Sequence, residues 1–279
     1  MMNESFAQKL WNASPKRIVE AVRRRLTLAR EAAAREPHWL KIQAGPLVGA
    51  EMLLAPAVSG SWQEIVEGRF DAFLFDALAR DGSIEGKTVW DIGAHFGYHT
   101  LCFARLVGES GHVVAFEPNP WNAERLRQNL EGNPELAGRV QVESCALADR
   151  DGEAEFVLSD DVESGDSSCS YVTGSMPPLE AGIYARFRRQ LVRMARVDAL
   201  LEQERSPPSV IKIDVEGAEL LVLRGGREFF TKYKPLLLIE VHHIQLMFHV
   251  CQFLRERGYQ VSLFEQVDLG PSRCFVWAK

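Results

Sequence analysis

The chain has 279 residues, of which 46% are hydrophobic and 25% are charged, and its formal net charge is −6. This apolar content supports a full core and excludes wholesale disorder, while the acidic balance argues against a nucleic-acid partner and no apolar run is long enough to span a bilayer. The five cysteines form no CxxC pair, and residues 1–11 lack the apolar core of a secretion signal, so we expect reduced thiols in a cytoplasmic protein.

Residues 1–61 are predicted to be an accessory segment of helix and loop. A Ser-Pro pair at 14–15 suits the start of a helix, and apolar residues then recur at helical spacing. Its basic face over 16–35 is also typical of helices that contact a membrane surface or an acidic partner, but we favour a solvated face. Pro37 ends this helix, and residues 40–61, rich in Gly and Pro, are predicted to be loops or short strands.

Residues 62–279 are predicted to form one α/β domain. Residues 62–86 lead into it, with helical spacing over 62–80, and beyond residue 87 short β-branched runs alternate with helical stretches. This alternation is typical of βαβ units and a parallel sheet. The predicted strands are 88–92, 112–116, 140–145, 210–213, 236–241, 260–264 and 274–277, and the predicted helices are 97–107, 119–131, 218–230 and 244–257.

The segment between the third and fourth of these strands is longer than a simple connection. An extra strand is predicted at 153–158. Residues 159–176, rich in Ser, Asp and Gly, are predicted to be a loop, within an insertion over 159–196 that covers a site.

A glycine turn follows the first strand of the sheet, in the order Asp91-Ile92-Gly93-Ala94-His95-Phe96-Gly97. Glycine allows backbone to approach a ligand, and the following helix offers unpaired N–H groups. A dinucleotide site requires glycine where this chain has His95, which disfavours a nicotinamide dehydrogenase. Asp91 would repel phosphate but suits a ligand that carries an ammonium group and no phosphate. S-adenosylmethionine is such a ligand.

Two further acids follow the second and third strands. Glu117 lies about 20 positions after the glycine turn, where acidic residues bind the two hydroxyls of a ribose. Asp149 has two interpretations. It is either an acceptor for the exocyclic amine of adenine or a turn residue before Arg150-Asp151-Gly152.

The fourth and fifth strands end in acids and a histidine. Lys212, Asp214 and Glu216 share one face by the two-residue period of a strand, and so do Glu240 and His242. The carboxyl ends of parallel strands line the ligand site, so Asp214 is expected to face a cofactor or substrate. A structural ion pair with Lys212 is the other interpretation of Asp214.

Four motifs together resemble the FkbM family of methyltransferases. They are Asp-Ile-Gly-Ala-x-x-Gly-Tyr-His-Thr at 91–100, Ala-Phe-Glu-Pro-Asn-Pro at 115–120, Ile-Lys-Ile-Asp-Val-Glu-Gly-Ala-Glu at 211–219 and Ile-Glu-Val-His at 239–242. The resemblance covers about 70–264 and implies a Rossmann-like class I methyltransferase, with a mostly parallel seven-stranded sheet, helices on both faces and an N-terminal helical extension. One departure is His95, where the family usually has Asn.

The resemblance also implies a function and a cofactor. We expect S-adenosylmethionine-dependent O-methylation of a hydroxyl group on a sugar, glycan or secondary metabolite. With the residues derived above, the expected cofactor-binding set is Asp91, Gly93, Ala94, His95, Gly97, Thr100, Glu117, Pro118, Asn119, Ala146, Asp149 and Asp214.

For catalysis we expect His242 to be the general base, oriented by Glu240, with Asp214 near the methyl group or the acceptor hydroxyl. No metal is expected in this main interpretation. One alternative makes Asp214, Glu216, Glu240 and His242 a divalent-metal site for an acceptor diol. Another is an inactive or nucleotide-binding protein that keeps the fold. A nucleic-acid amino-methyltransferase is disfavoured, because no Asn-Pro-Pro-aromatic element follows the fourth strand.

Overall fold

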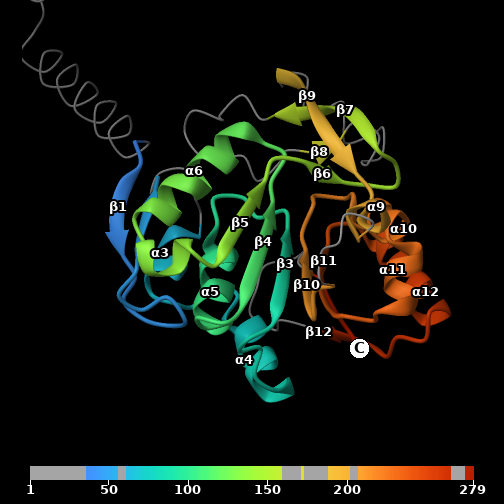
Figure 1. Ribbon diagram of the computed structural model, residues 1–279, viewed down its shortest axis with the longest axis horizontal. Helices are drawn as coiled ribbons and strands as arrows, with labels where there is room; N and C mark the ends of the chain where they lie inside the picture. The colour runs from blue at the N-terminus through green and yellow to red at the C-terminus, as the bar shows by residue number, and fades with distance from the viewer. Residues whose placement is uncertain (1–35, 56–60, 159–170, 173–187, 202–206, 265–273) are drawn as a thin grey trace, which may run out of the picture.

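A seven-stranded sheet forms the centre of the molecule (Figure 1). The computed structural model describes residues 36–55, 61–158, 171–172, 188–201, 207–264 and 274–279. The strands of the central sheet, in chain order, are β3 (Thr88–Ile92), β4 (His112–Phe116), β5 (Val140–Glu143), β10 (Val210–Ile213), β11 (Leu236–Val241), β12 (Val261–Phe264) and β13 (Cys274–Ala278).

The spatial order of these strands is β12-β13-β11-β10-β3-β4-β5. Only β13 runs against its neighbours, pairing antiparallel with β11 and β12, and the other described pairs are parallel. The predicted mostly parallel, seven-stranded sheet is therefore confirmed. The strand order reverses direction between β3 and β10, and such a reversal is where open α/β sheets bind ligands.

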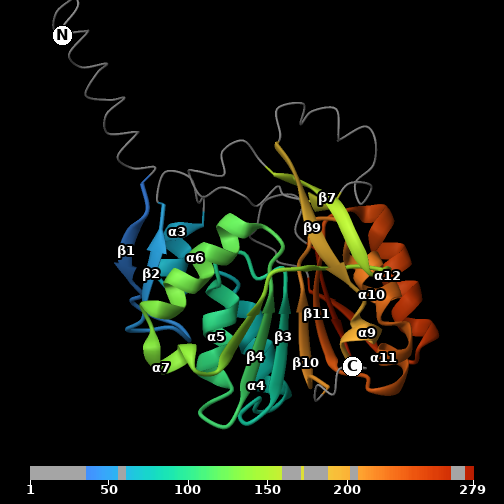
Figure 2. The ribbon, with the colours of Figure 1, turned by 45° about the horizontal axis from the view of Figure 1, so that its top comes forward.

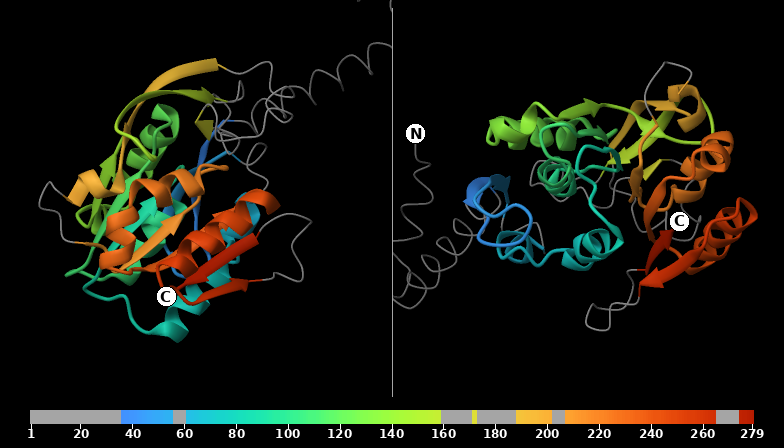
Figure 3. Two further views of the ribbon diagram at one scale, coloured as in Figure 1. Left: turned by 90° about the vertical axis from the view of Figure 1, so that its right-hand side faces the viewer. Right: turned by 60° about the horizontal axis from the view of Figure 1, so that its bottom comes forward.

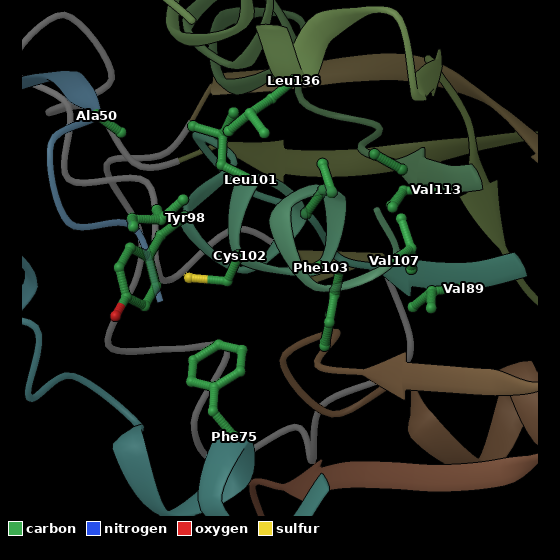
Figure 4. Packing of buried hydrophobic residues seen from close by; sticks show 14 of the residues in the cluster. Ala50, Phe75, Val89, Tyr98, Leu101, Cys102, Phe103, Val107, Val113 and Leu136 are labelled. Atoms are coloured by element: carbon green, nitrogen blue, oxygen red, sulfur yellow. The ribbon is translucent and has the colours of Figure 1, made fainter. Parts of the chain in front are cut away.

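Alternating side chains of each strand supply two cores. Val89 and Val113 face one helical layer, whereas Trp90 and Val114 face the other, as the two-residue period of a strand requires. The first core packs against α5 (Tyr98–Leu106), α6 (Pro120–Glu131) and α7 (Pro134–Ala137), and Figure 4 shows its α5 side. The second packs against the helices on the other face of the sheet (Figure 3), which are α9 (Val197–Leu201), α10 (Glu219–Gly225), α11 (Arg227–Lys232) and α12 (Ile244–Glu256).

Two helices that the sequence predicted as continuous are each split in two. The predicted helix over 62–80 consists of α3 (Trp62–Val66) and α4 (Ala72–Asp81). Between them Gly68 has φ +68°, and a Cβ there would lie 2.2 Å from the Ala44 backbone. Asp71 is also left-handed, with φ 48°, and its carboxylate forms an ion pair with His99 at 3.1 Å. Close packing on a neighbouring loop therefore overrides helical spacing here.

The predicted helix over 218–230 is split at Gly226, between α10 and α11. Gly226 leaves the helical region, with φ −118° and ψ 31°. A Cβ on the preceding Gly225 would lie 1.9 Å from the carbonyl oxygen of Ala148, so the end of α10 approaches that loop more closely than any side chain would allow.

A short antiparallel hairpin, β1 (His38–Lys41) and β2 (Glu51–Leu54), precedes the domain. It is anchored to the α6 side of the molecule by Asn129, whose Oδ1 accepts from Leu53 N at 2.6 Å. Asn133 adds two bonds: its Oδ1 accepts from Glu51 N at 3.1 Å and its Nδ2 donates to Glu51 O at 2.7 Å. The short strands expected within 40–61 are thus present, and the helix expected over 16–35 lies outside the described residues.

A second, four-stranded sheet lies beside α10 (Figure 2). Its strands, in spatial order, are β6 (Ala146–Leu147), β9 (Arg188–Ala195), β7 (Gly152–Leu158) and β8 (Tyr171–Val172). The extra strand predicted at 153–158 is confirmed as β7. The loop prediction for 159–176 is wrong at β8, and β9 was not predicted. The rest of the segment from 159 to 187 lies outside the described residues.

None of the helices in the described part of the chain combines the length and the apolar character that crossing a membrane requires.

Candidate active site

The turn between β3 and α5 is built on left-handed residues. Gly93, His95 and Gly97 have φ values of 81°, 53° and 93°. A Cβ on Gly93 would lie 1.8 Å from the carbonyl oxygen of Asp214, so glycine is what lets this turn approach the end of β10. A Cβ on Gly97 would lie 2.2 Å from Leu126 Cδ1 on α6. Both glycines therefore serve close packing within the chain.

His95 is the non-glycine residue among the three left-handed residues of this turn. It adopts the left-handed conformation, which Asn and His tolerate better than most side chains. Its backbone N–H donates to Glu117 Oε2 at 2.8 Å, and its ring lies 4.4 Å from the ring of Phe96, centroid to centroid. Burial lowers the pKa of His95 to about 4. The imidazole is thus neutral near pH 7, while the backbone makes the contact with Glu117.

Glu117 lies against the turn, where the sequence predicted it. The carboxylate is 4% exposed; Oε2 accepts from His95, and Oε1 accepts from Asn119 N at 2.8 Å and from Asn122 Nδ2 at 3.4 Å. Burial raises the pKa of Glu117 to about 7, although these hydrogen bonds and Lys212 oppose the shift. Among the described residues Oε2 has one hydrogen-bond partner, and a carboxylate oxygen accepts two bonds, so the group is able to bind a further hydroxyl.

Asp91 corrects a sequence-based expectation. Its carboxylate is fully buried: Oδ2 accepts from Thr100 Oγ1 at 2.6 Å, and Oδ1 lies 3.3 Å from Lys212 Nζ. The charge that was expected to attract an ammonium group of a ligand is therefore paired with Lys212 inside the protein. Thr100, expected at the cofactor, also makes its hydrogen bond to Asp91.

Lys212 joins both halves of the site. Besides Asp91, its Nζ lies 3.3 Å from Asp214 Oδ2 and donates to the carbonyl oxygen of Gly93 at 3.0 Å. Burial alone would lower the pKa of Lys212, but Asp91 and Asp214 raise it above its ordinary value. The structural ion pair considered for Asp214 is thus present, while the side chain of Asp214 remains 23% exposed.

The remaining members of the expected cofactor set occupy mixed positions. Asn119 is buried and caps α6, because its Oδ1 accepts from Trp121 N at 3.0 Å. Ala94 and Ala146 are buried, the second within β6. Pro118 lies between Glu117 and Asn119. Asp149 follows β6; its Oδ1 lies 3.8 Å from Arg150 Nη1 and makes no hydrogen bond to the described residues, so both interpretations of Asp149 stay predictions.

Three predicted catalytic side chains do come together at the carboxyl ends of β10 and β11. The parallel pairing of Ile213 with Ile239 brings the residues after them, Asp214 and Glu240, side by side. His242 Nε2 lies 3.6 Å from Asp214 Oδ1 and 3.8 Å from Glu240 Oε1. Glu216 Oε2 lies 3.4 Å from the same nitrogen. We call Asp214, Glu216, Glu240 and His242 the acceptor-edge cluster.

Glu219 is the functional candidate that sequence reasoning missed. It is fully buried at the start of α10, and its Oε1 lies 2.7 Å from His242 Nδ1. A carboxylate only accepts, so Nδ1 carries the hydrogen and Nε2 faces the acceptor-edge cluster. The expectation that Glu240 orients the imidazole is therefore wrong. An acid in the first turn of the helix after the Asp-Val-Glu-Gly segment was the available signal.

The electrostatics of His242 also depart from the expectation of a general base. Burial would lower the pKa of His242, but the hydrogen bond with Glu219 and the charges of Glu216 and Asp214 raise it to about 10. The imidazole therefore holds a proton at neutral pH in the ligand-free chain. Burial, with the neighbouring carboxylates, raises the pKa of Glu216 to about 8.

The site thus has two parts, and each part suits a different kind of ligand. The turn with Glu117 offers a buried acceptor for a ribose next to a helix N-terminus. The acceptor-edge cluster offers carboxylate oxygens and an imidazole nitrogen. Asp214, Glu240 and His242 each present one potential metal-ligand atom, and these atoms lie within 4.8 Å of one another.

Comparison with known proteins identifies similar sequences. The family model described as "Methyltransferase FkbM domain" matches residues 91–261. The hexuronic acid methyltransferase AglP of Haloferax volcanii is 30% identical over 159 residues, which is 57% of this chain and 57% of that protein. A protein-L-isoaspartate O-methyltransferase of Methanothrix thermoacetophila is 33% identical over 131 residues, 47% of this chain and 55% of that protein. The matches thus span little more than half of these relatives.

Among solved structures, a methyltransferase FkbM from Methylobacillus flagellatus KT aligns with a TM-score of 0.49 at 20% identity. That alignment covers 70% of this chain and 44% of the other.

Proposed function

The chain belongs to the methyltransferase FkbM domain family, and from this premise we propose that it transfers a methyl group from S-adenosylmethionine to a hydroxyl group of a sugar or a related polyhydroxylated acceptor. The matched region, 91–261, contains the glycine turn, Glu117 and the acceptor-edge cluster. One observation carries the choice of acceptor: an imidazole and three carboxylates gather at the edge of the sheet beside that turn.

The cofactor part of the proposal rests on Glu117 and the turn. A buried carboxyl group with spare acceptor capacity suits a ribose diol, and its charge would repel a phosphate. His95 contributes through its backbone N–H, which fixes Glu117 Oε2. S-adenosylmethionine has a ribose and no phosphate, and when bound it supplies an activated methyl group on a sulfonium. Asp91 and Thr100 act indirectly, since they hold the turn through Lys212 and α5.

The acceptor part of the proposal rests on charge. Carboxylates accept hydrogen bonds from hydroxyl groups but repel another carboxylate. Asp214 and Glu216 are the more accessible acids, with side chains 23% and 33% exposed, whereas Glu240 is 9% exposed. We therefore place an acceptor hydroxyl against Asp214, with Glu240 and His242 behind it. A sugar hydroxyl fits this edge better than the carboxyl group of an isoaspartyl peptide. The similarity to a hexuronic acid methyltransferase agrees with the sugar class, and the carboxylate of such an acceptor would have to point away from the cluster.

In this scheme, holding the methyl group and the acceptor hydroxyl in line supplies much of the rate acceleration. The methyl group is already activated, and holding two reactants in line is worth roughly 7–11 kcal/mol in well-oriented intramolecular reactions. The hydroxyl hydrogen also has to leave, and a positioned proton acceptor contributes about 10²–10⁴-fold. Asp214 is the carboxylate against which we place that hydroxyl, so it is the residue whose replacement has the largest expected effect.

Product chemistry tests the proposal. The purified chain is incubated with S-adenosylmethionine labelled in its methyl group, and with neutral oligosaccharides, uronic acids or isoaspartyl peptides. We expect label in a sugar, as a methyl ether that survives mild alkali. An alkali-labile methyl ester would show that the acceptor is a carboxyl group and would contradict the acceptor assignment.

Matched variants localise the activity. Asp214→Asn should lower turnover about 10²-fold or more, whereas Asp76→Asn, an exposed change on α4, should leave it unchanged. Failure of the wild-type chain to bind S-adenosylmethionine in a calorimeter would favour the non-catalytic alternative and reject the proposal.

A further inference from the structure

The acceptor-edge cluster has the dimensions of a cation site. Two ligands on opposite sides of an ion such as Mg²⁺ lie about 4 Å apart, because each bond is about 2.1 Å long. The candidate ligand atoms of Asp214, Glu240 and His242 all lie within 4.8 Å of one another. The distances from His242 Nε2 to the carboxylates, 3.4–3.8 Å, are longer than ordinary hydrogen bonds. The side chains therefore converge on one point without closing on each other.

His242 is oriented by a carboxylate at Nδ1, as metal-binding histidines usually are. Glu219 occupies Nδ1 at 2.7 Å, which leaves Nε2 directed at Asp214 and Glu240. Metal-ligating imidazoles almost always donate their other N–H to such a carboxylate or carbonyl, which fixes the tautomer and the ring orientation. The orienting acid comes from α10, whereas the ligand atoms come from β11 and the segment after β10, so three parts of the chain build the arrangement.

The second oxygen of Glu219 is an independent sign of missing positive charge. Glu219 is 0% exposed, and its Oε2 makes no hydrogen bond to the described residues. Its side chain is directed at the cluster, because the neighbouring oxygen contacts His242. A divalent cation in the cluster would place positive charge near this buried carboxylate.

We propose that Asp214, Glu240 and His242 bind one divalent cation of the Mg²⁺ or Mn²⁺ class at the acceptor edge of the sheet. On binding, the ion takes the place of the proton on His242 Nε2, which passes to solvent. Two carboxylates and water favour these hard ions, and Mn²⁺ also accepts imidazole. The role of the cation rests on the proposed function: a cation here binds an acceptor hydroxyl, or two neighbouring hydroxyls, and makes the hydrogen easier to remove. This proposal replaces the expectation of a metal-free site and favours acceptors with adjacent hydroxyl groups.

Direct measurement of metal uptake tests the proposal independently of methyl transfer. The full-length chain is treated with chelator, dialysed and titrated with Mn²⁺, and free Mn²⁺ is followed by electron paramagnetic resonance. We expect one equivalent bound by the wild-type chain and a loss of at least tenfold in affinity for Asp214→Asn and for His242→Ala. Glu219→Gln, which keeps the ligands but weakens the orientation of His242, should bind about 10- to 100-fold more weakly.

Two control variants separate the site from general charge effects. Asp76→Asn and Glu124→Gln remove exposed carboxylates elsewhere and should bind Mn²⁺ like the wild type. Circular dichroism checks that each variant is folded. Thermal melting provides a second readout, because a ligand that binds only the folded state raises the melting temperature. Mn²⁺ should raise it for the wild type and the controls but not for Asp214→Asn.

The outcomes for the cation and for the proposed function are distinct. No Mn²⁺ uptake by the wild type at millimolar concentration, or equal uptake by Asp214→Asn and His242→Ala, overturns the cation site. Methyl transfer that survives exhaustive chelation overturns its catalytic role while the proposed function stands. Mn²⁺ uptake by a chain that methylates no hydroxyl acceptor supports the site and rejects the acceptor assignment.

Discussion

Glu117 is buried, yet its carboxyl group has to be deprotonated to accept hydrogen bonds from both hydroxyls of a ribose. Its pKa is raised to about 7 by burial, against an ordinary value of 4.5. A deprotonated carboxylate accepts from both hydroxyls of a ribose, whereas a protonated carboxyl group has less acceptor capacity. The state of this one group therefore links pH to binding of the cofactor.

We expect the affinity for S-adenosylmethionine to rise with pH. If only the charged form of Glu117 binds, the dissociation constant at pH 6 should be about tenfold higher than at pH 8. Calorimetric titrations at these two values measure it, with Glu117→Gln as the comparison. The Gln variant should bind weakly at both values and without this pH dependence. Equal affinity of the wild type at pH 6 and pH 8 would contradict the assignment.

The stability of the ligand-free chain should change in the opposite direction. The folded state holds the proton of Glu117 more tightly than the unfolded state, so the contribution is fully present below pH 4.5 and is lost as the pH rises through about 7. The change is at most about 3 kcal/mol. Urea unfolding across this range should show a smaller loss of stability for Glu117→Gln than for the wild type.

At the scale of single residues, the sequence located the site better than it assigned roles. Glu117, Asp214, Glu240 and His242 lie where strand ends predicted them. Asp91 was assigned to a ligand, but it is already paired with Lys212. Glu219 went unnoticed, because its role depends on which neighbour reaches Nδ1 of His242. Periodicity gives the face that a side chain shares, but not its partner.

At the scale of elements, the turn between β3 and α5 depends on Gly93 for a close approach. Gly49 offers a matched control: its φ is +86°, against +81° for Gly93, but a Cβ on Gly49 would meet nothing within 4 Å. A Cβ on Gly93 would lie 1.8 Å from the Asp214 carbonyl oxygen. The two positions therefore share the conformational cost and differ in contact.

We expect Gly93→Ala to destabilise the fold more than Gly49→Ala. Both changes place Ala at positive φ, at a cost of about 1 kcal/mol. The contact with Asp214 should add roughly 1–3 kcal/mol at position 93 only. Urea unfolding measures both. Equal losses for the two variants would show that the turn is not held against β10 as described.

The elements themselves were predictable where their own residues specify them. Short β-branched and apolar runs located β3, β4, β5, β10 and β11 to within about two residues. The breaks at Gly68 and Gly226 were missed, because each depends on a contact distant in the sequence: the Ala44 backbone for the first, and Val197 for the second. The strand β9 was missed because its pairing with β7 joins residues 30 to 42 positions apart.

At the scale of the whole molecule, the N-terminal hairpin is held by the side chains of Asn129 and Asn133, which hydrogen-bond to the backbone of β2. Asn133 both donates to and accepts from the backbone of Glu51. Asn133 is 2% exposed and its bonds to Glu51 are partly buried, so loss of its amide would leave the Glu51 backbone groups without these partners. The hairpin is thus attached to the same layer of helices that supports the glycine turn.

We expect Asn133→Ala to lower the free energy of unfolding by about 1–3 kcal/mol. Glu131→Ala, an exposed change near the end of α6, should have little effect. Urea unfolding of both variants gives the comparison, and limited proteolysis followed by mass spectrometry shows whether cleavage within 36–55 accelerates. Identical behaviour of the two variants would show that Asn133 does not anchor the hairpin.

Lys212 sets a limit on how this scaffold is re-engineered. One ammonium group holds Asp91, the Gly93 carbonyl oxygen and Asp214 together, so a mutation chosen to alter substrate preference at Asp214 also disturbs the opposite half of the catalytic centre. Libraries intended to broaden the range of substrates should therefore randomise Glu216 first, since among the described residues its one ion pair is with His242, and should leave the lysine and its two acids as a fixed unit.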